Sequence, residues 1–404
     1  MGDIDGKVRQ LIEELGPKII EDFHWLHENP ELSFQEHDTT AFLRKEIEDL
    51  GIEILDSGLE TGFIALLKGS CDGPCIALRA DIDGLPVLEE STSTHPSKRT
   101  GQMHACGHDT HCGSLLGAAR ILARMKDQIH GSVKFLFQPA EEVNLGAKKL
   151  MSLNCLDNPK VDAIFGLHNS PEIPLGTIAV KNGALMASVD RINITITGKG
   201  GHGGVPQRNF DPIVAAAAVI QAAQTIVSRN VSPIDSCVVS ICNVRAGEGT
   251  TNNVCPDTVK MYGTIRCYKE ETQHLVERRL NSILQNICEA YECTGELEYI
   301  YELPVTANNP SLFEAADSAV RGAGVQPVDP IPSTGGEDFS IYLQTGVPGF
   351  FYWLGTRNEE NDCVYSWHSP HFKADDRCIP IGAGVYAMSV FEGIRAIENQ
   401  KAQQ

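Results

Sequence analysis

The sequence predicts an α/β protein of two domains, in which a small domain of βαββαβ order interrupts a larger α/β domain. The chain has 404 residues, which is more than one hydrophobic core usually organises. Short apolar runs alternate with helical segments early in the chain and again near its end, as expected of an α/β sheet. Between these parts, strand-like runs alternate polar and apolar residues with a period of two, which is typical of half-buried strands.

The first part of the chain is expected to begin with two helices. Apolar residues recur at helical spacing from Leu11 to Leu26, and Pro30 ends this helix. Ser33 and Glu36 have the spacing of a capping box, so we expect them to open a second helix that closes at Gly51. Buried strands and a helix should follow: strands at 75–81, 132–137 and 161–168, and a helix at 115–125.

The segment 183–302 is expected to form the inserted domain. Its strands and helices follow one another in ferredoxin-like order: 190–197, helix 211–228, 237–244, 258–267, helix 270–291 and 295–301. The α/β pattern then resumes with a helix at 311–320, a strand at 347–354 and a helix at 379–398. We therefore expect 1–182 and 303–404 to form one larger domain.

Composition excludes some classes of function. With 33 basic and 53 acidic residues the formal net charge is -20, which argues against binding nucleic acid or an anionic membrane through a basic surface. The 13 cysteines are scattered singly, as expected of reduced thiols in a cytoplasmic protein. The N-terminus lacks the pattern of a signal peptide, and we expect that no apolar run approaches a membrane span.

The stretch Met103–His111 holds three histidines, a cysteine and an aspartate within nine residues. Cys106 and His108 flank a glycine, so a thiolate and an imidazole can point at one zinc or manganese ion. A thiol nucleophile with its base is the alternative reading of the stretch alone.

Further candidate ligands follow predicted strands, at the edge where α/β sheets bind ligands. They are Glu141, Glu142 and His168, with His368 and His371 near the C-terminus. So many groups exceed the needs of one tetrahedral ion, which suggests two ions about 4 Å apart, bridged by Cys106 or a carboxylate. One of the adjacent glutamates can bind metal while the other acts as general base. Asp81 and Asp83 either orient ligating histidines or are solvated turn residues.

Six motifs together give the chain a resemblance to peptidase family M20, in its amidohydrolase branch: Leu78–Pro86, Met103–Asp109, Gln138–Glu142, Gly200–Gly203, Gly263–Arg266 and Gly336–Phe339. That branch includes hippurate hydrolases, auxin-conjugate hydrolases and N-acyl-amino-acid aminoacylases. The resemblance implies a mixed-sheet, metallopeptidase-like catalytic domain. It also implies two divalent ions, Mn²⁺ or Zn²⁺ with Co²⁺ or Ni²⁺ possible, and Glu141 as general base. The implied ligands are Cys106, His108, Glu142, His168 and His368; His371 would be a neighbour.

The resemblance also assigns roles to the insert, as a lid and a dimerisation domain in a homodimer or homotetramer. His202, on a glycine-rich loop, would donate to the oxyanion, and from the residues alone it reads as an ordinary loop histidine. Asn253 and Arg266 would hold the substrate carboxylate, although Arg266 also suits a strand-end salt bridge. Glu337 either supports a metal-binding histidine or caps a helix.

The expected activity is metal-dependent hydrolysis of the amide bond of N-acyl amino acids, giving a carboxylic acid and a free amino acid. Water activated by metal would attack, with Glu141 as general base. A dipeptidase or aminobenzoyl-glutamate hydrolase is an alternative on the same scaffold. A thiol hydrolase that uses Cys106 and a non-catalytic metal-binding protein are the alternatives from other classes.

Overall fold

A computed structural model of the chain describes residues 3–247, 249, 251–330 and 332–403. These residues form two compact units. Unit 1 comprises Met1–Leu185, Ala307–Ile331 and Glu337–Gln404, and unit 2 comprises Met186–Thr306 and Pro332–Gly336. The second segment of unit 2 has no signal in the sequence; it joins the unit because Ser333 pairs with Met186 and accepts the backbone N–H of Ala187.

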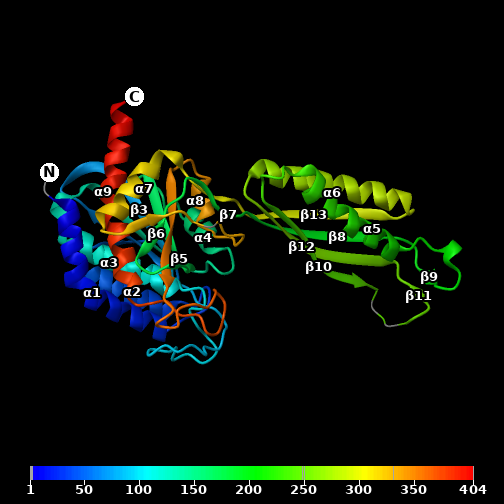
Figure 1. Ribbon diagram of the computed structural model, residues 1–404, viewed down its shortest axis with the longest axis horizontal. Helices are drawn as coiled ribbons and strands as arrows, with labels where there is room; N and C mark the ends of the chain where they lie inside the picture. The colour runs from blue at the N-terminus through cyan, green and yellow to red at the C-terminus, as the bar shows by residue number, and fades with distance from the viewer. Residues whose placement is uncertain (1–2, 248, 250, 331, 404) are drawn as a thin grey trace. The chain divides into compact units, whose positions relative to one another are not determined.

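Unit 1 is built on an eight-stranded sheet of order β1-β2-β4-β3-β5-β16-β6-β15 (Figure 1). β3 pairs in parallel with β4 and β5, and β5 with β16, whereas β2 and β6 pair antiparallel with β4 and β16, so the sheet is mixed. The bounds are β1 Glu53–Leu55, β2 Phe63–Lys68, β3 Cys71–Asp81, β4 His130–Gln138, β5 Ala163–Pro174, β6 Thr177–Ala179, β15 Gln326–Val328 and β16 Gly349–Arg357.

The helices of unit 1 pack on this sheet around one large apolar core. α3 and α9 contact each other and strand β3, while α1 contacts both of these helices. The bounds are α1 Ile4–Glu28, α2 His37–Asp49, α3 His108–Arg124, α4 Gly146–Ser152, α7 Phe313–Gly322, α8 Ser340–Leu343 and α9 Cys378–Ala402, with 3₁₀ turns η1 Lys126–Gln128 and η4 Pro310–Leu312.

The predicted capping box is wrong. Helix α2 begins at His37, and its N-cap residue Glu36 makes no capping hydrogen bond through its side chain. The Ser33 hydroxyl instead donates to Asp83 at 2.7 Å, and the Glu36 carboxylate accepts the backbone N–H of Ala140 at 2.8 Å. These side chains support the loops beside the candidate site, so their spacing has a cause other than helix initiation.

Unit 2 has a four-stranded antiparallel sheet of order β10-β12-β8-β13. Along β8, the buried residues Ile192, Ile194 and Ile196 alternate with more exposed ones and face the unit's own core. Both α5 and α6 contact this sheet (Figure 1). The bounds are β8 Val189–Thr197, α5 Pro212–Thr225, β10 Cys237–Ala246, β12 Thr258–Cys267, α6 Glu270–Ala290 and β13 Thr294–Leu303.

Smaller elements complete the chain. A two-stranded ribbon pairs β9 with β11, and another pairs β7 with β14. The bounds are β7 Gly183–Met186, β9 Gly201–His202, η2 Pro206–Arg208, η3 Ile226–Asn230, β11 Val254–Cys255 and β14 Thr306–Asn308.

Among the described residues, the helical run Pro212–Asn230 is long and apolar enough by composition to cross a membrane, with a mean hydropathy of 1.2. This corrects the expectation that no run would approach such a span. The run comprises α5 and η3, and α5 contacts β8, β10 and β12 of unit 2. Its high hydropathy comes from an alanine-rich stretch that packs on this sheet.

Candidate metal centre

The candidate site lies at one edge of the unit 1 sheet, where residues of the parallel strands β4, β3 and β5 lie side by side. Asp81 ends β3 and pairs with Gln138, the last residue of β4. His168 lies two residues beyond Gly166, the partner of Arg79, so it is level with Asp81. β5 does not end at His168 as predicted but continues to Pro174, because β16 pairs alongside it, with Trp353 opposite His168. His168 is therefore held inside a paired strand.

Cys106 and His108 enter the site from the start of α3. This helix begins at His108 and not near residue 115 as predicted, because its first turn buries polar residues that apolar periodicity does not detect. Gly107 has φ +82°, and a Cβ there would lie 2.4 Å from the Asn169 side-chain nitrogen. Glycine is thus required both by conformation and by space.

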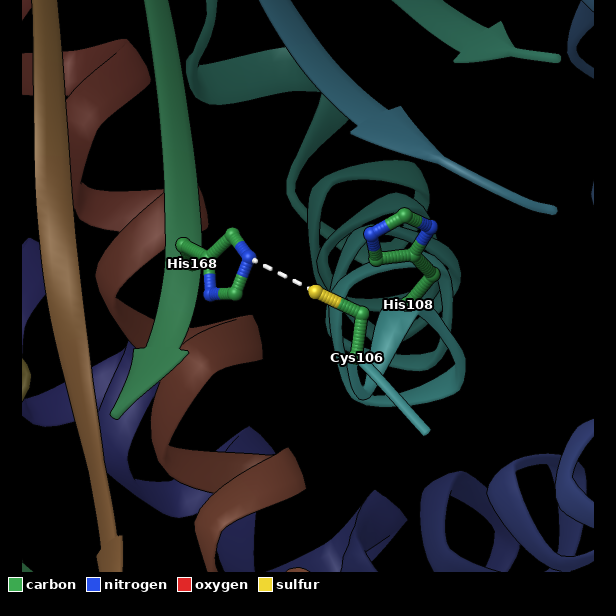
Figure 2. Close-up of side chains that lie close together, drawn as sticks. All are labelled: Cys106, His108 and His168. Atoms are coloured by element: carbon green, nitrogen blue, oxygen red, sulfur yellow. Dashed lines mark hydrogen bonds between the residues drawn. The ribbon is translucent and has the colours of Figure 1, made fainter. Parts of the chain in front are cut away.

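The Cys106 thiol points towards His168 from the opposite side of the site (Figure 2), with Sγ 3.5 Å from Nε2. Two groups of ligand atoms, each within 4.8 Å of one another, share this cysteine: Cys106 with His108 and His168, and Cys106 with Glu142 and His368. Within the part of the chain that the structure describes, the buried Nε2 of His108 and Oε1 of Glu142 have no hydrogen-bond partner. Unpartnered buried atoms of this kind are costly unless a cation occupies the site, so the donor set fits two metal ions.

Hydrogen bonds fix which atoms of the histidines face the site. Asp83, 1% exposed, lies 3.2 Å from Nδ1 of His108 through Oδ1. Nδ1 of His168 donates to the carbonyl of Asn169 at 2.7 Å. Both rings therefore present Nε2 to the site, the arrangement typical of metal-binding histidines. Asp83 also accepts the backbone N–H groups of Glu141 and Glu142, each at 3.1 Å, so it is an orienting residue and not a solvated turn residue.

His368 differs from the other candidate ligands because its side chain is 58% exposed. Its Nε2 lies 3.6 Å from Oε1 of Glu142. Its backbone has φ +63°, a region that non-glycine residues rarely adopt, and its N–H donates to the carbonyl of Ala105 at 2.8 Å. Strained backbone of this kind persists where surrounding contacts enforce it, and is common at functional sites.

The contacts of three further histidines differ from those of the candidate ligands. They are His104 and His111 of the stretch Met103–His111, and His371 near the C-terminus. Nδ1 of His111 bonds Asp81 at 2.6 Å, and its Nε2 accepts both the backbone and the side-chain N–H of Asn169. His111 therefore has no lone pair left for a metal. His104 is buried without a hydrogen-bond partner among the described residues. Nδ1 of His371 donates to the carbonyl of Glu90 at 2.9 Å, in keeping with a neighbouring role.

Glu141 lies between the candidate ligands and a cluster of buried charges. Its Oε1 accepts the backbone N–H of Asp338 at 3.3 Å, and its Oε2 is 3.9 Å from Nε2 of His108. Burial raises the pKa of Glu141 well above its usual value, and the nearby carboxylates of Glu337 and Asp338 add to this effect. The arrangement favours a carboxyl group that can hold a proton, as a general base must after it has acted.

Burial and charge also act on two candidate ligands. Burial, with the carboxylate of Glu142, raises the pKa of the Cys106 thiol well above its usual value. Burial opposes the charged form of His108, but Asp81 and Asp83 outweigh it and hold the pKa of this histidine well above its usual value.

Arg79 is the site residue whose importance the sequence did not indicate. It is fully buried and its guanidinium bonds Asp81 at 2.9 Å, Glu337 at 3.0 Å and Asp338 at 2.6 Å. Glu141, Glu337 and Asp338 also form a group of neighbouring carboxylates, but the guanidinium already balances two of them. Glu337 therefore belongs to this ion cluster. Arg79 belongs to a motif that the sequence showed, but two of its three partners, Glu337 and Asp338, lie far away in the chain.

The remaining predicted site residues all lie on unit 2. His202 is exposed on β9, and Nδ1 of its ring accepts the N–H of Gly204 at 2.9 Å. Asn253 is close by, because its carbonyl accepts the N–H of Gly203 at 2.7 Å. Arg266 lies near the other end of β12, where it donates to Thr264 at 2.6 Å. Within unit 2, His202 and Asn253 are thus brought together and Arg266 is not.

The fold and the site define a class of protein: a mixed-sheet α/β unit that gathers a cysteine, histidines and carboxylates suited to paired metal ions at the edge of its sheet. A sequence model of peptidase family M20/M25/M40 matches residues 77–392. The chain belongs to this family, as its motifs predicted.

Individual relatives agree with this assignment. The chain is 45% identical over 363 residues to N-acetylcysteine deacetylase of Bacillus subtilis (strain 168), covering 90% of this chain and 93% of the relative. It is 38% identical over 368 residues to IAA-amino acid hydrolase ILR1-like 2 of Arabidopsis thaliana, covering 90% and 82%. The crystal structure of Bacillus subtilis YXEP protein, described as a dinuclear metal binding peptidase, matches with a TM-score of 0.85 and 39% identity over 95% of this chain and 99% of that one.

Proposed function

We propose that this protein is a metal-dependent amidohydrolase that cleaves the amide bond of N-acyl amino acids. The observation that carries the proposal is the Cys106 thiol shared by two ligand groups, with Glu141 beside them. Membership of peptidase family M20/M25/M40 and the similarity to an N-acetylcysteine deacetylase and an IAA-amino acid hydrolase support it. The products would be a carboxylic acid and a free amino acid.

Two divalent ions suit the donor set, which combines one thiolate, imidazole nitrogens and a carboxylate. We propose Mn²⁺ or Zn²⁺, with Co²⁺ or Ni²⁺ as possible substitutes. Cys106, His108 and His168 would hold one ion, and Cys106, Glu142 and His368 the other. When bound, the ions supply Lewis acidity and lower the pKa of water towards about 7.

Glu141 would act as the general base and then as the general acid. It would take a proton from the attacking water and deliver that proton to the leaving amine nitrogen. The backbone N–H of Asp338 steadies one oxygen of this carboxylate while the other faces His108. Burial among Glu337 and Asp338 favours the protonated form, so the carboxyl can retain the proton between the two steps.

We propose that unit 1 is the catalytic domain and that unit 2 is a ferredoxin-like lid and dimerisation domain of a cytoplasmic homodimer or homotetramer. His202 would donate to the oxyanion that forms when the carbonyl is attacked. Asn253 and Arg266 would hold the substrate's carboxylate, since a guanidinium binds that group at two points. The exposure of His202 and Asn253 leaves both free to meet a ligand.

The decisive test replaces Glu141 with glutamine. Glu141→Gln should reduce turnover of an N-acyl amino acid by about 10²–10⁴-fold, the usual contribution of acid–base catalysis, and should keep its metal. The matched variant Glu142→Gln should lose metal as well as activity. Turnover and metal content, measured on the same preparations, separate the two roles. Near-normal turnover in metal-loaded Glu141→Gln would remove this residue from the mechanism.

A substrate panel decides between related activities. Acetyl, benzoyl, long-chain acyl and aminoacyl derivatives of amino acids separate the proposed activity from that of a dipeptidase or an aminobenzoyl-glutamate hydrolase. Inactivation by a chelator, reversed by Mn²⁺ or Zn²⁺, would exclude a thiol hydrolase based on Cys106. No hydrolysis across the panel with several metals would indicate a metal-binding protein without catalysis.

A further inference from the structure

Two cysteines of unit 2 face each other across neighbouring strands. Cys237 is the first residue of β10 and Cys267 the last of β12, and they are direct partners in the antiparallel register. Their sulfur atoms lie 3.6 Å apart, and both thiols are free. Cys267 is fully buried, whereas Cys237 is partly exposed. One thiol of the pair is thus open to solvent and the other lies directly behind it.

The strands that carry the two cysteines differ in position, because β12 lies inside the sheet and β10 lies at its edge. The backbone N–H of Cys267 donates to the Ser188 hydroxyl at 3.1 Å, and its carbonyl accepts the N–H of Ser188 at 2.8 Å. Cys237 lies on β10, which among the described strands is an edge strand and pairs with β12 alone. Cys267 is therefore fixed on both sides, and the β10 end can shift towards it.

We propose that Cys237 and Cys267 form a modification site, a thiol pair that small disulfides oxidise reversibly to an intramolecular disulfide. The bond would fasten the edge strand β10 to β12. It would form one residue away from Arg266, which lies next to Cys267 and opposite Val238.

The reaction proceeds in two exchanges and needs only a small disulfide as oxidant. The Cys237 sulfur, as thiolate, attacks one sulfur of the small disulfide and expels one small thiolate, which leaves a mixed disulfide on Cys237. Cys267 then loses its proton and attacks the Cys237 sulfur, which expels the second small thiolate. Two protein thiols are oxidised by two electrons, the small disulfide is reduced, and the two released protons leave with the two small thiols.

The geometry predicts that this bond forms readily and is also readily reduced. Directly opposite residues of antiparallel strands have Cβ atoms about 4.5–5.5 Å apart, whereas a relaxed disulfide prefers about 3.5–4.5 Å. Closure therefore draws the strand ends together, and strained or exposed disulfides are the reducible ones. A hydrogen bond from the Cys267 thiol lowers the pKa of Cys237, which suits it to attack first.

The test treats the full-length protein with oxidised glutathione, blocks the remaining thiols by alkylation and maps the linked peptides by mass spectrometry. The expected product is a peptide pair linked through Cys237 and Cys267, which disappears on reduction with a small thiol. Cys242, exposed on the same strand, is the internal reference and should carry only the mixed disulfide. Absence of the link while Cys242 is modified would overturn the proposal.

Two variants test the order of attack. Cys267→Ser should leave Cys237 as a lasting mixed disulfide, and Cys237→Ser should leave Cys267 unmodified because it is buried. Modification of Cys267 in the second variant would contradict the assignment of Cys237 as the attacking thiol. Amide hydrogen exchange along β10 should slow about tenfold or more in the oxidised wild type only. None of these readouts uses hydrolysis, so their failure is distinguishable from failure of the proposed function.

Discussion

The two units carry their candidate functional residues in opposite ways. In unit 1, His108 and His168 are buried and each is oriented by a second hydrogen bond, to Asp83 and to the carbonyl of Asn169. In unit 2, His202 lies exposed on β9, and Asn253 lies exposed directly before β11. Metal binding requires ligands set in place beforehand, whereas a group that meets a substrate has to remain accessible. The contrast predicts that changes at the oriented ligands of unit 1, and at the residues that hold them, alter metal content or stability, whereas changes at His202 and Asn253 of unit 2 alter turnover alone.

Among the changes that compare the two units in this way, the largest expected effect on turnover belongs to unit 2. His202→Ala should lower turnover by about 10²–10³-fold if this side chain donates to the oxyanion, with metal content and melting temperature unchanged. Steady-state kinetics and metal analysis on one preparation test this. His274→Ala, which changes another exposed histidine of unit 2, should leave turnover unaltered. Loss of metal in His202→Ala would contradict the expectation that this residue affects turnover and not metal binding.

A smaller effect is expected at the orienting carboxylate of unit 1. Asp83→Asn should weaken metal binding by about 10–100-fold, the usual cost of losing a group that orients a ligand. Ser33→Ala is the matched control, because it removes one hydrogen bond to Asp83 and leaves the contact with His108. Competition with a chromogenic chelator measures both affinities. Equal affinities in Asp83→Asn and the wild type would show that His108 needs no such support.

Gly107 and Gly101 offer a test of stability in unit 1. Both have positive φ, but a Cβ at Gly101 meets nothing within 4 Å, whereas one at Gly107 lies 2.4 Å from Asn169. Gly101→Ala should lower the free energy of unfolding by about 1–2 kcal/mol, and Gly107→Ala by about 1–3 kcal/mol more because of overpacking. Denaturant unfolding measures the difference. If both variants lost the same free energy of unfolding, the turn beside Cys106 would have to shift enough to make room for the added methyl group.

The stability of unit 1 between pH 7 and 10 should depend on His27, which bonds Asp109 at 2.6 Å and Glu89 at 3.3 Å. Burial opposes its charge, but these carboxylates prevail and raise its pKa from 6.5 to about 10. The folded protein keeps this proton where the unfolded chain loses it. The stabilisation is therefore complete below pH 6.5 and is lost as the pH rises towards 10. His27→Gln should show a flatter decline in melting temperature from pH 7 to 10. Parallel curves for the two proteins would contradict the pairing.

Sequence patterns were sufficient for four strands of the unit 1 sheet, β3, β4, β5 and β16, and for the residues that meet at its edge, but not for β1, β2, β6 and β15. Apolar runs mark buried strands, and the strand ends carry Asp81, Glu141 and Glu142 to one place because parallel strands finish at one edge. Patterns did not predict the role of Ser33 or Glu36, the start of α3 or the ion cluster of Arg79. The contacts of Ser33, of Glu36 and of Arg79 with Glu337 and Asp338 join residues distant in sequence, and the start of α3 buries polar residues; apolar periodicity encodes neither. The roles of His202, Asn253 and Arg266 stay predictions.

The exposure of His368 has a consequence for the order in which metal exchanges. Its side chain is 58% exposed, compared with 1% for His108. The group that contains His368 and Glu142 is therefore the one that solvent and chelators reach first. Under the proposed ligand assignment, an ion bound there should dissociate faster than one bound by His108 and His168, so that dilution or mild chelation gives a half-loaded protein. Metal loss followed over time should then show two phases, with the retained ion protected by the buried side of the site.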